Sequence, residues 1–269
     1  MREIRFSIDR DWVHAAHGES GFEGALPVTN SWGGWPSAVG IAPHLVLRIV
    51  VSGTPDPVTG YLVNIQELDA ILRRHAIPEA AQRLFAAGVR LTGEQLLAGI
   101  VEKITPLVPA NCHFESLQMC ATPFLSYRMR PGDAEMIELT QCFEFSAAHR
   151  LHVAALSDEE NRRTFGKCNN PNGHGHNYQI EVTVAGPIDA KTGAVLPLPR
   201  FESVVKSEVI DRFDHKHLNS DTAEFAELNP SVENIARVIW EILEAKVSPA
   251  KLRRVRVWET AKTYAEYVS

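Results

Sequence analysis

Two histidines stand one residue apart in the segment Phe165-Gly-Lys-Cys-Asn-Asn-Pro-Asn-Gly-His-Gly-His-Asn-Tyr178, where His174 and His176 precede an alternating apolar run. In a β-strand, residues i and i+2 face the same side about 6–7 Å apart, so both imidazoles can point at one ion. A third histidine, His149, ends another short apolar segment. Three neutral imidazoles with an open fourth position are typical of a catalytic zinc, whereas a structural zinc usually has four ligands rich in cysteine. A lone histidine is more often a core or surface residue, but this combination predicts a metal site.

Several motifs in the second half of the chain resemble the 6-pyruvoyltetrahydropterin synthase family and follow that family's order. Besides the histidine segment, they are Ser157-Asp-Glu-Glu-Asn161, Asp214-His-Lys-His-Leu-Asn219, Pro230-Ser-Val-Glu-Asn-Ile-Ala236 and Trp258-Glu-Thr260. The resemblance covers residues 136–269 and implies the tunnelling fold, or T-fold. In this α+β fold, modules with a four-stranded antiparallel sheet and two helices (ββααββ) assemble into barrels through oligomerisation.

The resemblance also implies a reaction. The substrate would be 7,8-dihydroneopterin triphosphate and the product 6-pyruvoyltetrahydropterin, with loss of triphosphate and without an external redox cofactor. Zn²⁺ held by His149, His174 and His176 would bind the side-chain oxygens and stabilise the negative charge that follows proton loss. Three imidazoles also suit other transition metals, so the sequence leaves the metal's identity open.

Cys168 is the candidate base, since it precedes the histidine pair by five intervening residues. A thiol has a pKa near 8.5 and is a weak base at neutral pH, but a nearby metal or imidazolium lowers this pKa. Asp214 and His215 are expected to activate it, because the carboxylate orients the imidazole that exchanges protons with the thiol. In the family, the equivalents of this pair act with the cysteine across a subunit interface. Without its context, Cys168 would be an ordinary loop thiol.

Substrate binding is expected to involve four further residues. A pterin presents an N–H and an amino group side by side, which one carboxylate can accept together. Glu259, followed by Thr260, matches the family's pterin-anchoring glutamate. Ser231 and Glu233 lie in a turn with which the family often lines the pterin pocket, although Ser231 suits a helix N-cap equally well. The residues that bind the triphosphate stay open.

Composition places the chain among ordinary globular proteins. The sequence has 269 residues, a formal net charge of −6 and four cysteines without paired spacing. The charge argues against a nucleic-acid binder, which normally has a basic face. No segment reaches the roughly 18–20 apolar residues of a membrane span, and the start lacks the apolar core of a signal peptide. We therefore expect a cytoplasmic protein with reduced thiols that binds neither nucleic acid nor membranes.

The pattern of apolar residues predicts the same order of elements twice. The second half reads as strands at 137–148 and 176–185, helices at 200–212 and 231–245, and strands at 252–260 and 264–268, with a long loop after the first strand. The first half reads as strands at 4–12 and 44–51, helices at 65–75 and 93–105, and strands at 112–121 and 124–129. Turn formers recur at matching places in Ser52–Gly60 and Ala185–Gly193. We predict two modules, 1–130 and 136–269, joined by the polar linker 130–135.

The two modules are not chemically equal. His17 and His44 match His149 and His176, but Ala42 replaces His174. No cysteine occurs before Cys112, and residues 76–90 contain nothing like the Asp-His pair. We predict that it is a degenerate, non-catalytic copy. A different metal or ligand site that uses His14, His17 and His44 is the alternative.

Assembly and activity leave several alternatives. One four-stranded sheet has two unpaired edges that neighbouring modules would cover, so we expect a homo-oligomer with sites at module interfaces. The favoured reaction is the pyruvoyl synthesis. The related 6-carboxytetrahydropterin synthase of the queuosine pathway, in which the cysteine stands three residues from the histidine pair, is the second reading, and a non-catalytic pterin-binding protein is the third.

Overall fold

The computed structural model describes residues 1–8, 29–30, 35–36, 43–86, 90–132 and 136–269. The expectations for His14, His17 and Ala42 lie outside these residues, as do the end of the 4–12 strand and part of the 130–135 linker. The chain divides into two compact units, which are described separately: Met1–Leu139 with Gly186–Val195, and Thr140–Ala185 with Leu196–Ser269. Among the helices described, none is long and apolar enough to cross a membrane.

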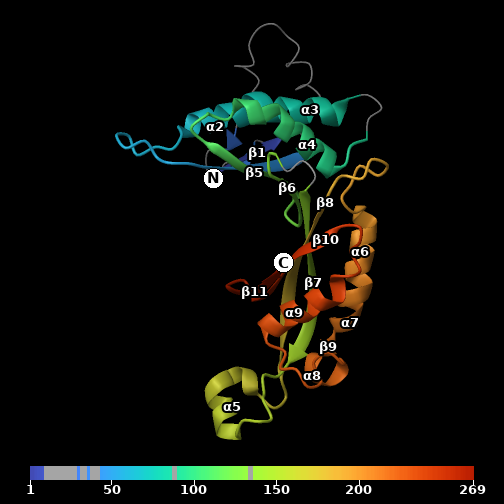
Figure 1. Ribbon diagram of the computed structural model, residues 1–269. Helices are drawn as coiled ribbons and strands as arrows, with labels where there is room; N and C mark the ends of the chain where they lie inside the picture. The colour runs from blue at the N-terminus through green and yellow to red at the C-terminus, as the bar shows by residue number, and fades with distance from the viewer. Residues whose placement is uncertain (9–28, 31–34, 37–42, 87–89, 133–135) are drawn as a thin grey trace. The chain divides into compact units, whose positions relative to one another are not determined.

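The first unit contains a four-stranded antiparallel sheet with helices on one side (Figure 1). Its elements are β1 (Arg2–Ser7), β2 (Thr29–Asn30), β3 (Trp35–Pro36), β4 (His44–Ser52), α2 (Ile65–Ile71), the π-helical η2 (Leu72–Ala76), α3 (Ile77–Phe85), α4 (Gly93–Ile104), the 3-10 turn η3 (Thr105–Leu107), β5 (His113–Thr122) and β6 (Leu125–Met129). The sheet order is β1-β4-β5-β6, and α4 packs against β5 and β6. Phe6, Leu47 and Ile49 alternate along β1 and β4 and are fully buried, because period-2 alternation turns one face of each strand to the core.

The second unit contains the strands that carry the site. They are β7 (Ile137–His149), β8 (His174–Gly186), β9 (Lys216–His217), β10 (Lys251–Thr260) and β11 (Thr263–Val268), and their sheet order is β7-β8-β10-β11. The two-residue strand β9 pairs with β7 in parallel, with Ala148 opposite His217. Tyr178, Ile180 and Val182 alternate along β8 and are fully buried. The opposite face is charged, since Glu181 pairs there with Arg254 and Arg256.

The helical segments of the second unit lie beside its sheet, except for the first of them, which lies beyond the ends of the strands (Figure 1). They are α5 (Asp158–Phe165), the 3-10 turn η4 (Gly166–Asn169), α6 (Leu198–Val205), the π-helical η5 (Lys206–Ile210), α7 (Asp211–Phe213), α8 (Leu218–Asp221) and α9 (Val232–Leu243). α9 packs against β10 and β11, and Phe201, Phe213 and Ile239 have no exposed side-chain surface. The long loop expected after the first strand of this half is wrong in part, because it contains α5.

In both units, helical stretches lie between the second and third strands of the four-stranded sheet, which are β4 and β5 in the first unit and β8 and β10 in the second. Each of the earlier stretches contains a π-helical segment, η2 in one unit and η5 in the other. The sheet orders β1-β4-β5-β6 and β7-β8-β10-β11 also correspond strand for strand. The α+β class with antiparallel four-stranded sheets is thus confirmed. The shared order supports two tandem modules, which stays a prediction, as do the module boundaries.

Candidate metal centre and adjoining hollow

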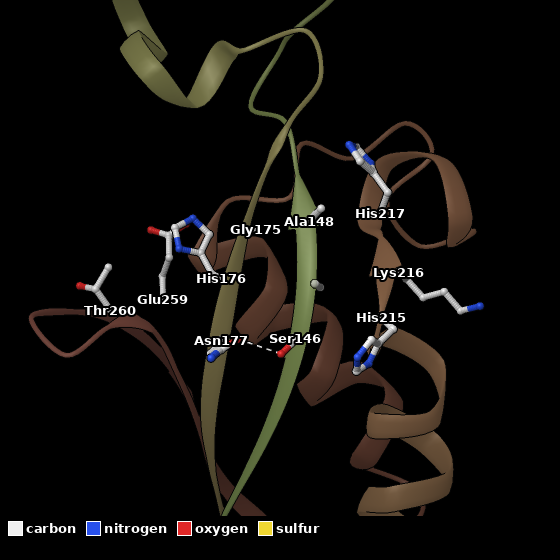
Figure 2. Close-up of a pocket in the computed structure, with 11 residues that line it drawn as sticks. Ser146, Ala148, Gly175, His176, Asn177, His215, Lys216, His217, Glu259 and Thr260 are labelled. Atoms are coloured by element: carbon white, nitrogen blue, oxygen red, sulfur yellow. Dashed lines mark hydrogen bonds and ion pairs between the residues drawn. The ribbon is translucent and has the colours of Figure 1, made fainter.

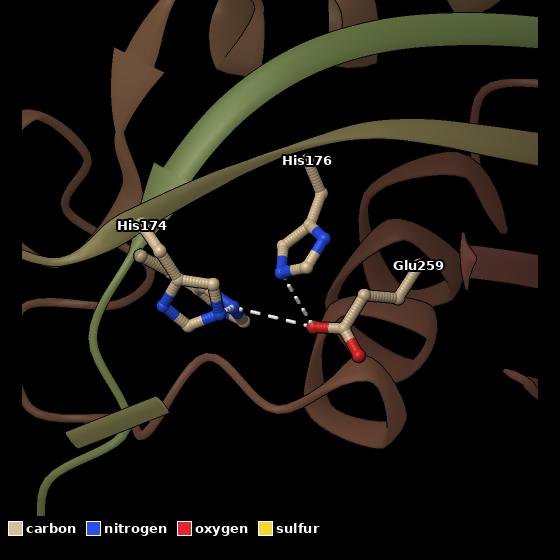
Figure 3. A group of neighbouring side chains, drawn as sticks. His174, His176 and Glu259 are labelled. Atoms are coloured by element: carbon tan, nitrogen blue, oxygen red, sulfur yellow. Dashed lines mark hydrogen bonds and ion pairs between the residues drawn. The ribbon is translucent and has the colours of Figure 1, made fainter. Parts of the chain in front are cut away.

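The three predicted metal ligands meet at one end of the second sheet. His149 is the last residue of β7, while His174 and His176 begin β8, which lies beside β7. β10 pairs with β8 up to Trp258, and Glu259 follows it directly. Figure 3 shows the imidazoles of His174 and His176 turned toward the Glu259 carboxylate. Strand register therefore brings together four side chains that lie up to 110 residues apart in the sequence, from His149 to Glu259.

The distances in this group suit a single metal ion. One ligand atom from each of His149, His174, His176 and Glu259 lies within 4.8 Å of all the others. Nε2 of His149 is 3.2 Å from Nε2 of His174, and Oε1 of Glu259 is 3.2 Å from His149 Nε2 and 3.3 Å from His176 Nε2. Its four donors are of the kinds that hold zinc.

The tautomer of His149 is set by the backbone. Its Nδ1 atom lies 2.7 Å from the carbonyl oxygen of Pro230, so Nδ1 carries the proton and donates it. Nε2 then turns its lone pair toward His174 and Glu259. Such a bond to a backbone carbonyl is the usual arrangement behind a metal-ligating histidine. His149 itself is fully buried, so this orientation is well fixed.

The charge states of the group also favour a cation. Burial lowers the pKa of His174 and of His176 from 6.5, which keeps both imidazoles neutral and able to bind a metal. The close contact with His149, ahead of the charges of the other two histidines, lowers the pKa of Glu259, so this carboxylate is ionised. With its proton on Nδ1, His149 turns the Nε2 lone pair toward a carboxylate oxygen of Glu259 only 3.2 Å away, and a cation between these two acceptors would remove their repulsion. The residues present therefore fit a divalent metal.

Glycine is required just before the histidine pair. Gly173 has a φ of +70°, and a Cβ atom there would lie 2.7 Å from His217 Nε2 and 2.9 Å from the carbonyl oxygen of His149. An L residue is disfavoured at this φ and would also push on a predicted ligand. Gly175, between His174 and His176, is less constrained, since its nearest neighbour would be Ala147 O at 3.7 Å.

A wide hollow of about 780 Å³ adjoins the metal group. Its lining includes His176, Glu259 and Thr260 on one side of the paired strands β7 and β8, and the β9 region on the other (Figure 2). The small residues Ala147, Ala148 and Gly175 lie between the two sides and leave room for a ligand. Ser146 Oγ and Asn177 Oδ1 hydrogen-bond at 2.8 Å within it.

Asp214 and His215 form the expected pair at the edge of this hollow. His215 Nδ1 lies 2.7 Å from Asp214 Oδ2, and Asp214 Oδ1 accepts a 2.8 Å hydrogen bond from the backbone N–H of Ser146. This backbone bond, followed by the bond from His215, lowers the pKa of Asp214. His215 has a φ of 57°, a left-handed conformation that is rare outside glycine and often marks functional sites. Its side chain is 83% exposed, so it points toward solvent or a partner.

Cys168 lies in η4 rather than in the metal group. Its carbonyl oxygen accepts a 2.9 Å hydrogen bond from the N–H of Leu151, which holds the turn against the end of β7. Burial and then the Glu259 charge raise the pKa of the thiol. The sequence predicted a lowered pKa for Cys168, whereas in a single chain without a metal this pKa is raised. The exposed His215 is consistent with activation by another chain, which stays a prediction.

The four predicted substrate residues fall in two places. Glu259 and Thr260 line the hollow, but Glu259 also belongs to the metal group, whereas the sequence predicted only a pterin anchor and an open fourth position. Ser231 is the N-cap of α9 and accepts a hydrogen bond from the N–H of Asn234, and Glu233 is exposed in the first turn. Thus Ser231 has the capping role that was its alternative.

Some residues of the hollow had no predicted role, among them two from β9. Lys216 and His217 line it from β9, and the Nδ1 atom of His217 is buried without a hydrogen-bond partner among the described residues. The motif Asp214-His-Lys-His217 contains both, so the sequence did mark their position. Helix α5 was also missed, although Ser157 and Glu160 form a capping box, a recognisable helix start.

Comparisons with known proteins agree with this geometry. The family described as 6-pyruvoyl tetrahydropterin synthase matches residues 138–269. The chain is 44% identical over 130 residues to the 6-pyruvoyl tetrahydrobiopterin synthase of Drosophila melanogaster, across 48% of this chain and 77% of that protein. It belongs to the 6-pyruvoyl tetrahydropterin synthase family. The human 6-pyruvoyl tetrahydrobiopterin synthase is 42% identical over 130 residues, across 48% of this chain and 90% of that protein.

Two other matches are a solved structure and a carboxytetrahydropterin synthase. A solved structure of the Caenorhabditis elegans 6-pyruvoyl tetrahydropterin synthase is 40% identical and covers 50% of this chain and 96% of that one, with a TM-score of 0.48. The 6-carboxy-5,6,7,8-tetrahydropterin synthase of Haemophilus influenzae is only 28% identical over 152 residues, across 49% of this chain and 99% of that protein. The chain is thus more similar in sequence to the pyruvoyl group than to this carboxy enzyme.

Proposed function

We propose that this protein converts 7,8-dihydroneopterin triphosphate to 6-pyruvoyltetrahydropterin with elimination of triphosphate. The observation that carries the proposal is the group of His149, His174, His176 and Glu259 beside an open hollow, in a chain that belongs to the synthase family. The reaction needs no external oxidant, because the substrate's side chain is oxidised while its ring is reduced.

The metal we propose is Zn²⁺, held by His149, His174 and His176. When bound, it would polarise the hydroxyl and carbonyl oxygens of the substrate side chain and make the adjacent carbons more acidic. The backbone bond from His149 to Pro230 orients the first ligand, and burial keeps the other two imidazoles neutral. Metal analysis of His174→Ala, with His152→Ala as a nearby non-ligand control, tests this set: only the first variant should lose the metal.

Proton transfer is assigned to Cys168 with Asp214 and His215. The ionised Asp214 holds a proton on His215 Nδ1, which leaves Nε2 of the exposed imidazole to exchange a proton with a thiol. Because one chain alone raises the pKa of Cys168, we propose that the His215 of a neighbouring chain supplies the missing activation. Sites shared between chains of a homo-oligomer would explain the exposure of His215.

Pterin recognition is assigned to Glu259, with Thr260 beside it in the hollow. An ionised carboxylate can accept the ring N–H and the adjacent amino group as a bidentate pair. Glu259 is ionised in the structure and partly exposed, so it can serve this role from the mouth of the hollow. Ser231 and Glu233 stay weaker candidates for the pocket wall.

A turnover assay with dihydroneopterin triphosphate and metal-loaded protein tests the proposal. Triphosphate release is followed in time, and the pterin product is weighed by mass spectrometry. A 6-pyruvoyl product supports the proposal. A 6-carboxy product with acetaldehyde would assign the queuosine-pathway reaction instead, and pterin binding without release would mark a non-catalytic binder.

The first half has a separate proposed role as a degenerate, non-catalytic module. Its sheet repeats the order of the second, but Ala42 stands at the position matched to His174. We also retain the cytoplasm as the proposed location, supported by the free cysteines Cys112, Cys120 and Cys168, since free thiols are typical of reducing compartments.

A further inference from the structure

A tight turn in the first unit exposes large apolar side chains. Asp56 organises this turn, because its Oδ1 atom accepts hydrogen bonds from the backbone N–H groups of Val58 and Thr59 and from the Thr59 hydroxyl. Val58 is 91% exposed and Tyr61 is 68% exposed. Both side chains belong to one turn, and tyrosine is enriched at protein–protein interfaces.

The same turn occurs after β8. Oδ1 of Asp189 accepts from the N–H groups of Lys191 and Thr192 and from the Thr192 hydroxyl, in the pattern seen at Asp56. Gly60 and Gly193 end the two turns, both with a φ of +71°. The two turns differ in their environment, since the residues that follow Gly193 are buried. Val195 is 3% exposed and Leu196 is fully buried, whereas the matching residues Leu62 and Val63 are only half-buried.

The start of helix α4 buries the Asp189 turn. The hydroxyl of Thr92, the helix N-cap, donates to the carbonyl oxygen of Gly193, and the N–H of Val195 donates to Glu94 Oε1 at 3.3 Å. A Cβ atom on Gly193 would lie 2.7 Å from the side chain of Gln95, so the turn is seated closely on this helix. At Gly60, by contrast, a Cβ atom would meet nothing within 4 Å.

Helix α9 begins with matching groups. Ser231, Glu233 and Asn234 hold the N-cap and the second and third positions of α9, as Thr92, Glu94 and Gln95 do in α4. Both N-cap hydroxyls accept a hydrogen bond from the third residue and can still donate one. Glu94 is only 3% exposed beneath the Asp189 turn, whereas Glu233 is exposed. The start of α4 is thus covered by the Asp189 turn. The Asp56 turn and the start of α9 are a second turn and a second helix start of the same kinds.

We propose that the Asp56 turn of one chain docks on the start of α9 in a second copy of this chain. By analogy with the contact between the Asp189 turn and α4, the Ser231 hydroxyl donates to the Gly60 carbonyl, Glu233 accepts from the Leu62 N–H, and Tyr61 is buried between the chains. Because the two surfaces differ, the interface is heterologous, and successive chains join head to tail. The inference rests on the repeated turn and helix starts and not on the proposed reaction.

Sedimentation equilibrium of Tyr61→Asp across protein concentrations tests this interface. We expect the dissociation constant of the assembly to rise about 30-fold or more, as for a buried aromatic anchor, while the urea midpoint at low protein concentration stays unchanged. Phe124→Asp is the matched control, since Phe124 is 62% exposed in the β5–β6 hairpin and away from the turn. A monomeric wild-type chain, or a Tyr61→Asp variant that assembles like wild type, would overturn the proposal.

Crosslinking between two different variants tests the direction of the contact. Chains with Tyr61→Cys are mixed with chains with Glu233→Cys and treated with a short bismaleimide, and the wild type is treated alike to account for its four cysteines. A covalent dimer that forms in the mixture but in neither variant alone supports the heterologous contact. A chain that carries both substitutions and links only within itself would show that the turn and α9 meet inside one molecule, which contradicts the proposal.

Discussion

Oε1 of Glu259 lies 3.2 Å from Nε2 of His149, although the sequence predicted a pterin anchor at the first residue and a metal ligand at the second. Glu259 also lines the hollow, so its carboxylate can turn either to a metal or to a ligand. The two roles exclude each other at any one moment if both carboxylate oxygens are needed by the pterin. Glu259 would then release the metal group when a substrate enters.

Glu259→Gln separates these roles. If Glu259 binds the pterin, the amide loses the charge-assisted pair and KM rises by about 10- to 100-fold, since a hydrogen bond to a charged group contributes roughly 1.5–3 kcal/mol. Bound metal, measured by atomic absorption, stays near one ion per chain. Loss of the metal with an unchanged KM for reloaded protein would instead assign Glu259 as the fourth ligand.

Cys168→Ala should abolish turnover without removing the metal. General-base catalysis typically contributes 10²- to 10⁴-fold, so kcat should fall by about that factor, as followed by triphosphate release. Cys112→Ala, which removes another free cysteine, is the control and should retain activity. An active Cys168→Ala variant would assign the base to a different group.

His215→Asn tests a catalytic role against a structural one. Asparagine tolerates the left-handed conformation of residue 215, and the wild-type side chain is 83% exposed, so the free energy of unfolding should change by less than about 0.5 kcal/mol. The rate should nevertheless fall about 10²-fold or more, with a flatter pH–rate profile. His113→Asn, at an exposed histidine of the first unit, should change neither quantity.

Glu94 gives a pH dependence of stability that is independent of the metal. Burial raises its pKa above the ordinary 4.5, so the folded state holds this proton more tightly than the unfolded state does. Its contribution to stability is therefore complete below pH 4.5 and is lost as the pH rises through the raised pKa. Relative to wild type, Glu94→Gln should unfold at a higher urea concentration at pH 8 and at a similar one at pH 4. Glu102→Gln, at an exposed position of the same helix, should show no such trend.

Residues with short-range signals were predicted well. Alternation located β8, and a run of branched apolar residues located β4. The spacing of His174 and His176 was enough to place them on one face of a strand. The matching turns at Asp56 and Asp189 were also visible, since both contain the same turn formers before a glycine.

What the sequence left out depends on long-range register. Nothing local shows that β10 pairs with β8 so that Glu259 reaches His149, and this contact changed the expected role of Glu259. The two-residue strand β9 is too short for a periodic signal, so Lys216 and His217 were not placed in the hollow. The π-helical segments η2 and η5 leave the apolar pattern of a helix almost unchanged and were not distinguished from α-helix.

Neighbouring positions of the loop around Gly173 should differ greatly in how well they tolerate substitution. Any side chain there would press at once on His217 and on the backbone of His149, two residues from different strands, and would also oppose the left-handed φ. A single codon change can thus damage the metal group and the hollow together. In a saturation library selected for metal retention, position 173 should accept only glycine, while position 175, two residues later, should accept alanine. The site's evolvability is therefore limited by a residue that supplies none of its chemistry.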